Sequence, residues 1–249
     1  MTNHPAKFSK TLYETLIETI RGEQNVVDPF AGVSRIHEIA ELAEVPNSFG
    51  IELEQEWAEQ WTNTPTRQTV TGDSRDLCEI LQTHNIQTQC FLTSSTYGNR
   101  MADHHTAKDK STRNTYTHQL GHPLTEGNTG MMHFAHNGQY ETTHQQIWQQ
   151  CHNHLNTNGK LILNISNFLR TRKTPGPRSP LKQYETITEH LNNNKIRVLC
   201  QPTLWHTHTL QQIGFTLTNQ QHTKTRRQKQ GANNNIRAPH ETILTFTKT

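Results

Sequence analysis

The sequence predicts an α/β protein with a mainly parallel sheet that helices cover on both faces. Between residues 25 and 93, short apolar runs typical of strands alternate with segments of helical periodicity. The connections between them are short, and Gly, Pro or acidic residues follow the strands. A chain of 249 residues is long enough for one sizeable core. We therefore expect a single domain over residues 1–249.

The first half of the chain shows these elements in strict alternation. Leu12, Leu16 and Ile20 recur at helical spacing after Ser9, a residue type that often caps helices, so a helix is expected over 9–21. The segments that follow predict strands at 25–27, 49–53, 68–72 and 88–93, with helices at 35–44, 54–61 and 74–84 between them.

The second half begins with a long stretch that has no periodicity. Residues 98–138 are rich in Gly, His and Thr, and a loop of this length is usually functional, so we expect a lid there. Regular patterns then predict a helix at 139–157, a strand at 160–166, a Pro-rich basic loop at about 167–182, a helix at 182–193, and strands at 195–200 and 241–248. Seven strands are expected in total.

Charge and cysteine content limit the class of protein. There are 24 Lys and Arg residues against 21 Asp and Glu, a net charge of +3 that is too small to indicate nucleic acid by itself. The four cysteines lie far apart without a C-x-x-C pair, so reduced thiols are expected rather than a zinc site or disulfides. No run approaches 18 apolar residues, and the N-terminus has no apolar signal region. We expect a cytoplasmic protein that is neither exported nor membrane-spanning.

The candidate ligand residues follow the strands, at the edge where open parallel sheets bind ligands. Asp28 and a glycine turn at Gly32 follow the first strand, Glu52 ends the second, and Asp73 follows the third. A carboxylate at the second strand suits two ribose hydroxyls, and Asp73 suits an adenine amine. Together these residues predict a cofactor that contains adenosine. Taken alone, Asp28 is also compatible with a role as a cap of the next helix.

The segments "VVDPFAGVSR", "TGDSRDL" and "FLTSSTYGNR" resemble the S-adenosylmethionine-dependent DNA methyltransferases that modify adenine N6 or cytosine N4. Motif I of that family reads D-P-F-x-G-x-G, and its catalytic motif reads S-P-P-Y, D-P-P-Y or N-P-P-Y. The resemblance implies a Rossmann-like class I methyltransferase fold and S-adenosylmethionine as the cofactor. It also implies these cofactor-binding residues: Lys7, Phe8, Asp28, Pro29, Phe30, Gly32, Glu52, Asp73 and Ser74.

The same resemblance implies a catalytic role for the segment Ser94, Ser95, Thr96 and Tyr97. Ser94 and the neighbouring backbone carbonyl would accept hydrogen bonds from the target amine, while Tyr97 stacks on the base. Well-oriented reactants gain about 7–11 kcal/mol, so in-line positioning would supply most of the acceleration. A base inside a duplex would have to be flipped out to reach the site.

Two residues depart from the family pattern. Ser34 replaces the last glycine of motif I, and Ser95 replaces the proline that fixes the catalytic backbone. Two alternatives therefore stay open: an RNA methyltransferase acting on guanine N2 of tRNA, and a cofactor- and nucleic-acid-binding module with impaired catalysis.

Basic residues in the two long loops are the candidates for contact with DNA or RNA phosphates. These are Arg100, Arg113, Arg170, Arg172 and Lys173. The adjacent His104 and His105 point apart on an extended segment, so no metal site is expected. Trp57 and Trp61, one helical turn apart, are expected to serve packing.

Overall fold

The computed structural model describes residues 8–98, 116–173, 182–224 and 240–249. Its centre is a seven-stranded sheet in the order β3-β2-β1-β4-β5-β10-β9, in which β10 pairs antiparallel to both neighbours and the other pairs are parallel. The strands are β1 (Asn25–Asp28), β2 (Asn47–Glu52), β3 (Arg67–Thr71), β4 (Cys90–Thr93), β5 (Lys160–Ile165), β9 (Phe215–Lys224) and β10 (His240–Lys248). The predicted mainly parallel sheet is confirmed.

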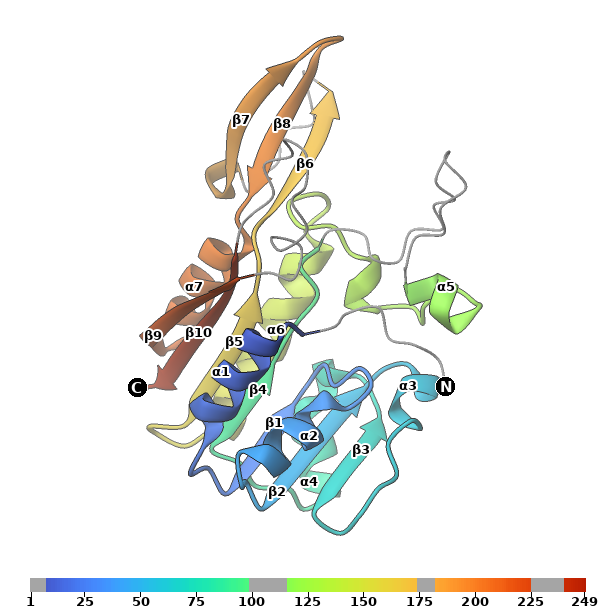
Figure 1. Cartoon of the computed structure of the whole chain (residues 1–249), viewed down its shortest axis with the longest axis vertical. Helices are drawn as coiled ribbons and strands as arrows, with labels where there is room; N and C mark the ends of the chain where they lie inside the picture. Colours follow the sequence, from blue (N-terminus) through green and yellow to red (C-terminus); the bar gives the residue numbers. More distant parts are fainter. Residues whose placement is uncertain (1–7, 99–115, 174–181, 225–239) are drawn as a thin grey trace.

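Helices cover both faces of this sheet (Figure 1). On one face lie α1 (Lys10–Ile20) and α2 (Arg35–Leu42), and on the other α4 (Leu77–Thr83), α6 (Gln139–His154) and α7 (Pro202–Ile213). Side chains alternate across a strand, so Val26 packs with α1 and α2 while Val27 packs with α4 and α6. Two separate apolar cores result, one on each side of the sheet.

A second, antiparallel sheet of three strands was not predicted. It consists of β6 (Phe168–Lys173), β8 (Lys195–Cys200) and β7 (Glu185–Leu191), in that order. Only two residues separate β5 from β6, so this sheet extends beyond the carboxyl edge of the central sheet (Figure 1).

Three sequence predictions are corrected by this sheet. The helix expected at 182–193 is a short 3₁₀ turn, η3 (Lys182–Tyr184), followed by β7, because the β-branched residues Thr186 and Ile187 pair with β8. The basic loop expected at 167–182 is strand β6 over its first part. The strand at 195–200 exists, but it belongs to the small sheet, and β9 takes its place in the central one.

The remaining elements surround the carboxyl ends of the strands. They are α3 (Gln55–Ala58), η1 (Ser74–Asp76), α5 (Tyr116–Leu120) and η2 (Thr129–Met131). The predicted lid at 98–138 contains α5 and η2 from residue 116 onward, and residues 99–115 of it lie outside the described ranges.

The four cysteines are free thiols, as predicted. Cys90 in β4, Cys151 in α6 and Cys200 in β8 are fully buried, and Cys78 is partly exposed. No helix in the described ranges is both long enough and apolar enough to cross a membrane. Within the same ranges, no three His, Cys, Asp or Glu side chains form a cluster that could hold a metal ion, and His104 and His105 lie outside them.

Ser34 occupies a backbone conformation that favours glycine. It is the N-cap of α2, with φ of +62°. Its buried hydroxyl lies 2.7 Å from the Thr69 hydroxyl, which in turn lies 2.8 Å from Nε2 of the buried His37. These hydrogen bonds offset the backbone strain, because each satisfies a polar group that is shielded from water.

Ser34→Gly is expected to be more stable than Ser34→Ala by about 1 kcal/mol. Both variants lose the hydroxyl, but only alanine keeps a Cβ in the left-handed region. Urea denaturation of the two variants measures the difference directly. Equal stabilities would show that the strain at this position is negligible.

Candidate functional site

A cavity opens at the carboxyl ends of β1, β2 and β4. It encloses about 830 Å³ of space, a volume that includes open solvent at its mouth. Its lining includes Phe8, Asp28, Phe30, Gly32, Glu52, Trp57, Thr93, Ser94, Thr96, Tyr116, Asn128 and Thr129. Strand β1 pairs in parallel with β2 and with β4, so the carboxyl ends of all three strands lie at the same edge and bring these residues together.

Glu52, at the end of β2, is the most buried carboxylate that lines this cavity, with 7% of its surface exposed. Its Oε2 accepts a hydrogen bond from the Gly32 amide at 2.7 Å, and its Oε1 accepts one from the Glu54 amide at 2.9 Å. Burial raises the pKa of Glu52 to about 7, although the two amides favour the charged form. Each oxygen keeps a second lone pair for a ligand hydroxyl.

Asp28 joins β1 to β4 at the same edge. Its Oδ1 accepts hydrogen bonds from the Phe30 amide at 2.9 Å and from the Thr93 hydroxyl at 2.6 Å. Burial raises the pKa of Asp28 to about 6. The alternative role as a helix cap is wrong, because the N-cap of α2 is Ser34.

A second cavity of about 340 Å³ adjoins the first and shares Phe30, Glu52, Asn128 and Thr129 with it. Asp73, Ser74 and Pro29 line this second cavity. The Asp73 carboxylate accepts hydrogen bonds from Nε of Arg75 at 3.0 and 2.9 Å. Burial alone would raise the pKa of Asp73, but the hydrogen bonds and charge of Arg75 lower it, so this carboxylate is ionised at neutral pH.

The buried Glu54 carboxylate forms hydrogen bonds with the segment that covers both cavities, at Thr125 and Asn128. Glu54 is 1% exposed, and its Oε1 accepts hydrogen bonds from the Thr125 amide at 2.9 Å and from the Asn128 side-chain amide at 2.6 Å. Its Oε2 accepts one from the Thr125 hydroxyl at 3.0 Å. Since Asn128 and Thr129 line both cavities, Glu54 holds this part of the predicted lid in place.

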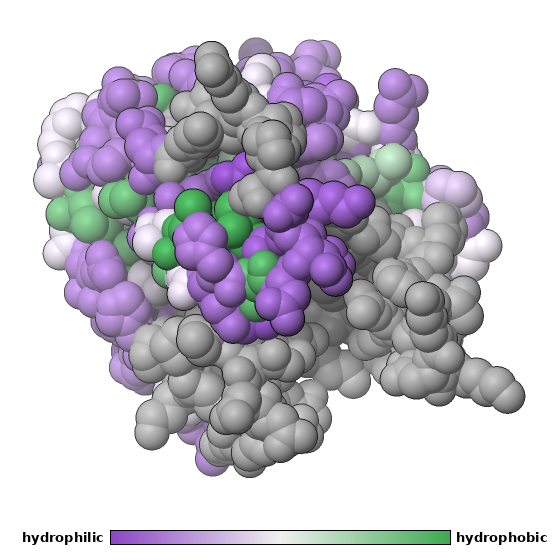
Figure 2. Space-filling model, turned by 90° about the horizontal axis from the view of Figure 1, so that it is seen from above, coloured by the Kyte–Doolittle hydropathy of each residue, from purple (hydrophilic) through white to green (hydrophobic). Residues whose placement is uncertain are grey.

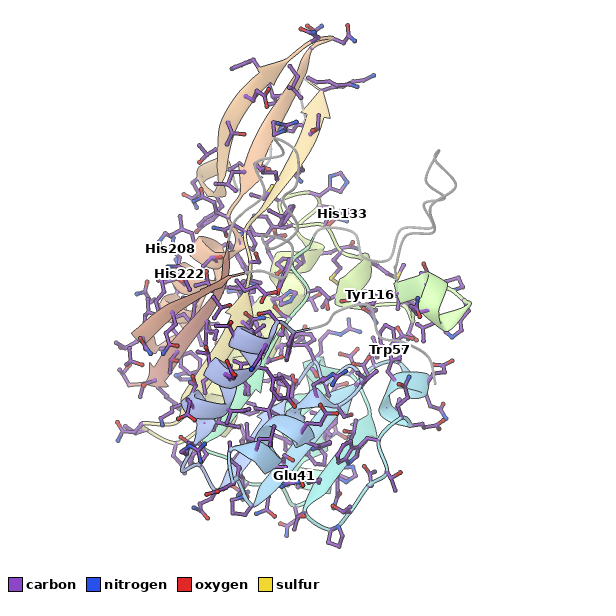
Figure 3. The ribbon with its side chains drawn as sticks, viewed as in Figure 1. Glu41, Trp57, Tyr116, His133, His208 and His222 are labelled. Atoms are coloured by element: carbon purple, nitrogen blue, oxygen red, sulfur yellow. The ribbon has the colours of Figure 1, made fainter. Side chains whose placement is uncertain are left out.

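Trp57 and Tyr116 form an aromatic wall of the first cavity. Their rings meet edge to face at 5.3 Å between centroids (Figure 3). Trp57 also packs with Leu124, so the predicted packing role of this tryptophan is confirmed. Trp61 packs on the His37 ring, with the two centroids 4.4 Å apart.

The predicted catalytic segment is only partly directed at the cavity. Ser94 and Thr96 line it, whereas Ser95 and Tyr97 line neither of the two cavities described above. The Asn164 side-chain amide, on β5, donates hydrogen bonds to Ser94 Oγ at 3.0 Å and to Tyr97 Oη at 3.3 Å. Burial raises the pKa of Tyr97 far above its usual value. In this structure Tyr97 faces β5 rather than the cavity.

Comparison with known proteins identifies a shared fold but no relative by sequence. No protein-family model and no curated protein matches the sequence. An S-adenosylmethionine-dependent methyltransferase from Mesorhizobium loti has a similar structure, with a TM-score of 0.51 and 9% identity over 96% of each chain. The chain has the fold of these methyltransferases.

Two further methyltransferase structures give the same result. A provisionally assigned S-adenosylmethionine-dependent methyltransferase from Listeria monocytogenes matches with a TM-score of 0.51 and 12% identity, over 95% of this chain and 98% of that one. A provisionally assigned RNA methyltransferase from Pyrococcus horikoshii matches with a TM-score of 0.51 and 10% identity, over 95% of this chain and 83% of that one. The methyltransferase fold predicted from the sequence is therefore confirmed, at identities that establish the fold alone.

Of the candidate phosphate contacts, the three that the structure describes, Arg170, Arg172 and Lys173, line neither cavity. Arg170 and Arg172 are on β6, and both pair with the buried carboxylate of Glu185, Arg172 at 3.3 Å. Lys173 is exposed at the end of the same strand. Most of the described residues on the face seen in Figure 2 are hydrophilic. Lys7, Arg100 and Arg113 lie outside the described residues.

Several residues of the site were missed by the sequence analysis. They are Glu54, Thr93, Tyr116, Asn128, Thr129 and Asn164. Glu54 had a detectable signal, because it is a second carboxylate two residues after Glu52 at a strand end. The others depend on contacts between segments that are distant in the sequence.

Proposed function

We propose that this chain is an S-adenosylmethionine-dependent methyltransferase that modifies an exocyclic amino group of a DNA base, adenine N6 or cytosine N4. The observation that carries the proposal is the pair of adjoining cavities at the carboxyl edge of a methyltransferase-type sheet, with acidic residues at the ends of β1, β2 and β3. Glu52 lies where the two cavities meet, and Asp73 lines only the second. This arrangement suits a ribose next to Glu52 and an adenine next to Asp73.

The cofactor, when bound, would supply a methyl group already activated by a positively charged sulfur. The protein then needs to position the acceptor rather than to generate a strong nucleophile. Ser94 Oγ is oriented by the Asn164 amide and keeps a free lone pair that can accept a hydrogen bond from the target amine. The Asp28 carboxylate, on the same cavity wall, favours a cationic group by charge.

Cofactor binding tests the first half of this proposal. Isothermal titration calorimetry with S-adenosylmethionine and S-adenosylhomocysteine should show saturable binding of both. No binding at millimolar ligand would overturn the cofactor site and the enzyme together.

Methyl transfer tests the second half. With tritiated S-adenosylmethionine we expect label in duplex DNA. Label in bulk tRNA alone would show that the substrate is RNA, the class of polymer named for the Pyrococcus horikoshii methyltransferase. Cofactor binding without transfer to either polymer would support the binding-module alternative.

Cofactor affinity is expected to increase with pH between about 5 and 8. Burial raises the pKa of Asp28 to about 6 and that of Glu52 to about 7, so both carboxyls are largely protonated in the free protein at the acidic end of this window. Ribose hydroxyls and a cationic sulfur favour the ionised forms, so binding at pH 6 should release protons. Titration in two buffers of different ionisation enthalpy measures this release. Glu52→Gln should reduce it, and a release unchanged by that substitution would contradict the role of Glu52.

A further inference from the structure

Three buried side chains form a chain of hydrogen bonds that ends on the predicted catalytic segment. The Trp148 indole nitrogen lies 3.0 Å from Nδ1 of His206, and Nε2 of His206 lies 2.9 Å from the Tyr140 hydroxyl. The Tyr140 hydroxyl donates to the backbone carbonyl of Thr96 at 2.7 Å. Trp148, His206 and Tyr140 are fully buried, so no bond in the chain is exchanged for water.

The chemistry of the groups fixes the direction of every bond. An indole N–H only donates, so Nδ1 of His206 must be the unprotonated acceptor. Burial lowers the pKa of His206 well below its usual value, so the ring is neutral and its proton lies on Nε2. His206 therefore donates to Tyr140, which leaves the hydroxyl proton of Tyr140 free to bond the Thr96 carbonyl.

The end point of this chain is adjacent to the residue that departs from the family motif. Ser95, which replaces the backbone-fixing proline, is 2% exposed and lies between Ser94 and Thr96, both of which line the first cavity. The far end of the segment is also held, because the Phe134 amide donates to the Gly98 carbonyl at 3.2 Å. The Phe134 ring packs edge to face on Tyr140, with centroids 5.6 Å apart.

We propose that Tyr140 is a positioning residue that, through His206 and Trp148, holds the Ser94–Tyr97 segment in a fixed geometry without the proline. This inference rests on the proposed function, since it assigns the segment to catalysis. Tyr140 lines neither cavity, and Glu52 and Asp73, the residues proposed for the ribose and the adenine, are outside its chain of hydrogen bonds, so its loss should act mainly on the target amine, through Ser94 and Thr96, and leave cofactor affinity nearly unchanged. Tyr140→Phe would also leave the His206 Nε2–H and the Thr96 carbonyl without partners in a buried site.

The principal test is Tyr140→Phe in the full-length protein. Misplacement of reacting groups by about 1 Å can cost roughly 100-fold in rate, so we expect kcat for methyl transfer to fall by about 10- to 100-fold. The Kd for S-adenosylmethionine should change by less than about threefold, because the cofactor contacts are unaffected. An unchanged kcat would overturn the proposal, as would equal losses in kcat and in cofactor affinity.

Tyr184→Phe is the matched control. The Tyr184 hydroxyl lies 3.2 Å from Nδ1 of His208 (His208 is labelled in Figure 3), so this variant also breaks a tyrosine–histidine pair, outside the chain of hydrogen bonds. Its kcat should equal that of the wild type. Loss of activity in both variants would indicate a general packing effect and contradict the specific role of Tyr140.

A second pair of variants covers the case in which Tyr140→Phe does not fold. The amide of His206→Gln can still donate to Tyr140, whereas His206→Leu cannot. We expect transfer rates in the order wild type, glutamine, leucine, and equal rates for the two variants would contradict the proposal.

Hydrogen exchange separates this inference from the proposed function. Amides of residues 94–98 should exchange faster in Tyr140→Phe than in Tyr184→Phe, and the ¹⁵N shifts of His206 should show the Nε2–H tautomer. If the wild type transfers no methyl group, the proposed function fails. Hydrogen exchange and the His206 tautomer then decide by themselves whether Tyr140 holds the segment. Unchanged exchange in Tyr140→Phe, or an Nδ1–H tautomer, would then overturn the hydrogen-bond role.

Discussion

Glu52→Ala is expected to weaken S-adenosylmethionine binding by about 10- to 100-fold, because hydrogen bonds to a buried charged group contribute about 1.5–3 kcal/mol. The carboxylate lies where the two cavities meet, so its removal affects ribose binding directly. It also releases the Gly32 and Glu54 amides, which hold the cavity wall. Calorimetric titration measures the change in Kd.

Glu41→Ala is the control for this substitution. Glu41 is an exposed residue on α2 that lines neither cavity (Figure 3). Its removal should leave the Kd unchanged. Equal affinity in the wild type and Glu52→Ala would contradict the assignment of the ribose site.

Glu54→Ala is expected to release the segment over the cavities and to weaken cofactor binding by about tenfold or more. The buried carboxylate is the partner of the Thr125 amide, the Thr125 hydroxyl and the Asn128 side chain, and alanine replaces none of these bonds. Hydrogen exchange over residues 121–131 should increase, because the freed groups will turn to water. Calorimetry on the same samples measures the affinity.

Glu56→Ala provides a close comparison for Glu54→Ala. Glu56 pairs with His122 at 2.8 Å, so it reaches the same segment, but both partners are exposed. Exposed ion pairs contribute about 0–1 kcal/mol, so little change in exchange or affinity is expected. If both variants behave alike, burial of Glu54 is not what holds the segment.

The central sheet was predictable where local patterns determine it. Buried apolar residues mark β1, β2 and β4, and α2 and α4 each bury an apolar face, so sequence periodicity and burial agree there. Strand β9 was missed because it is an edge strand with mostly polar residues, and only Phe215 and Thr223 of its described side chains are buried. Helix α7 was missed because its sequence, "PTLWHTHTLQQI", has few apolar residues.

The candidate site likewise contains residues that local sequence patterns predict and residues that they do not. Asp28, Glu52 and Asp73 could be grouped from the sequence because parallel strands end at one edge. Glu54 contacts residues 71 and 74 positions away, and Tyr140 contacts Thr96 across 44 positions, so no local pattern indicates either role. The orientation of Tyr97 toward Asn164 likewise depends on the pairing of β4 with β5.

The buried thiols give this protein internal reporters of local opening. Cys90 is in the central sheet, Cys151 in a covering helix and Cys200 in the small sheet, and each is inaccessible in the folded state. A thiol reagent can modify each one only when its own surroundings open. Alkylation rates followed by mass spectrometry therefore report separately how often the central sheet, the covering helix and the small sheet open, without any engineered label.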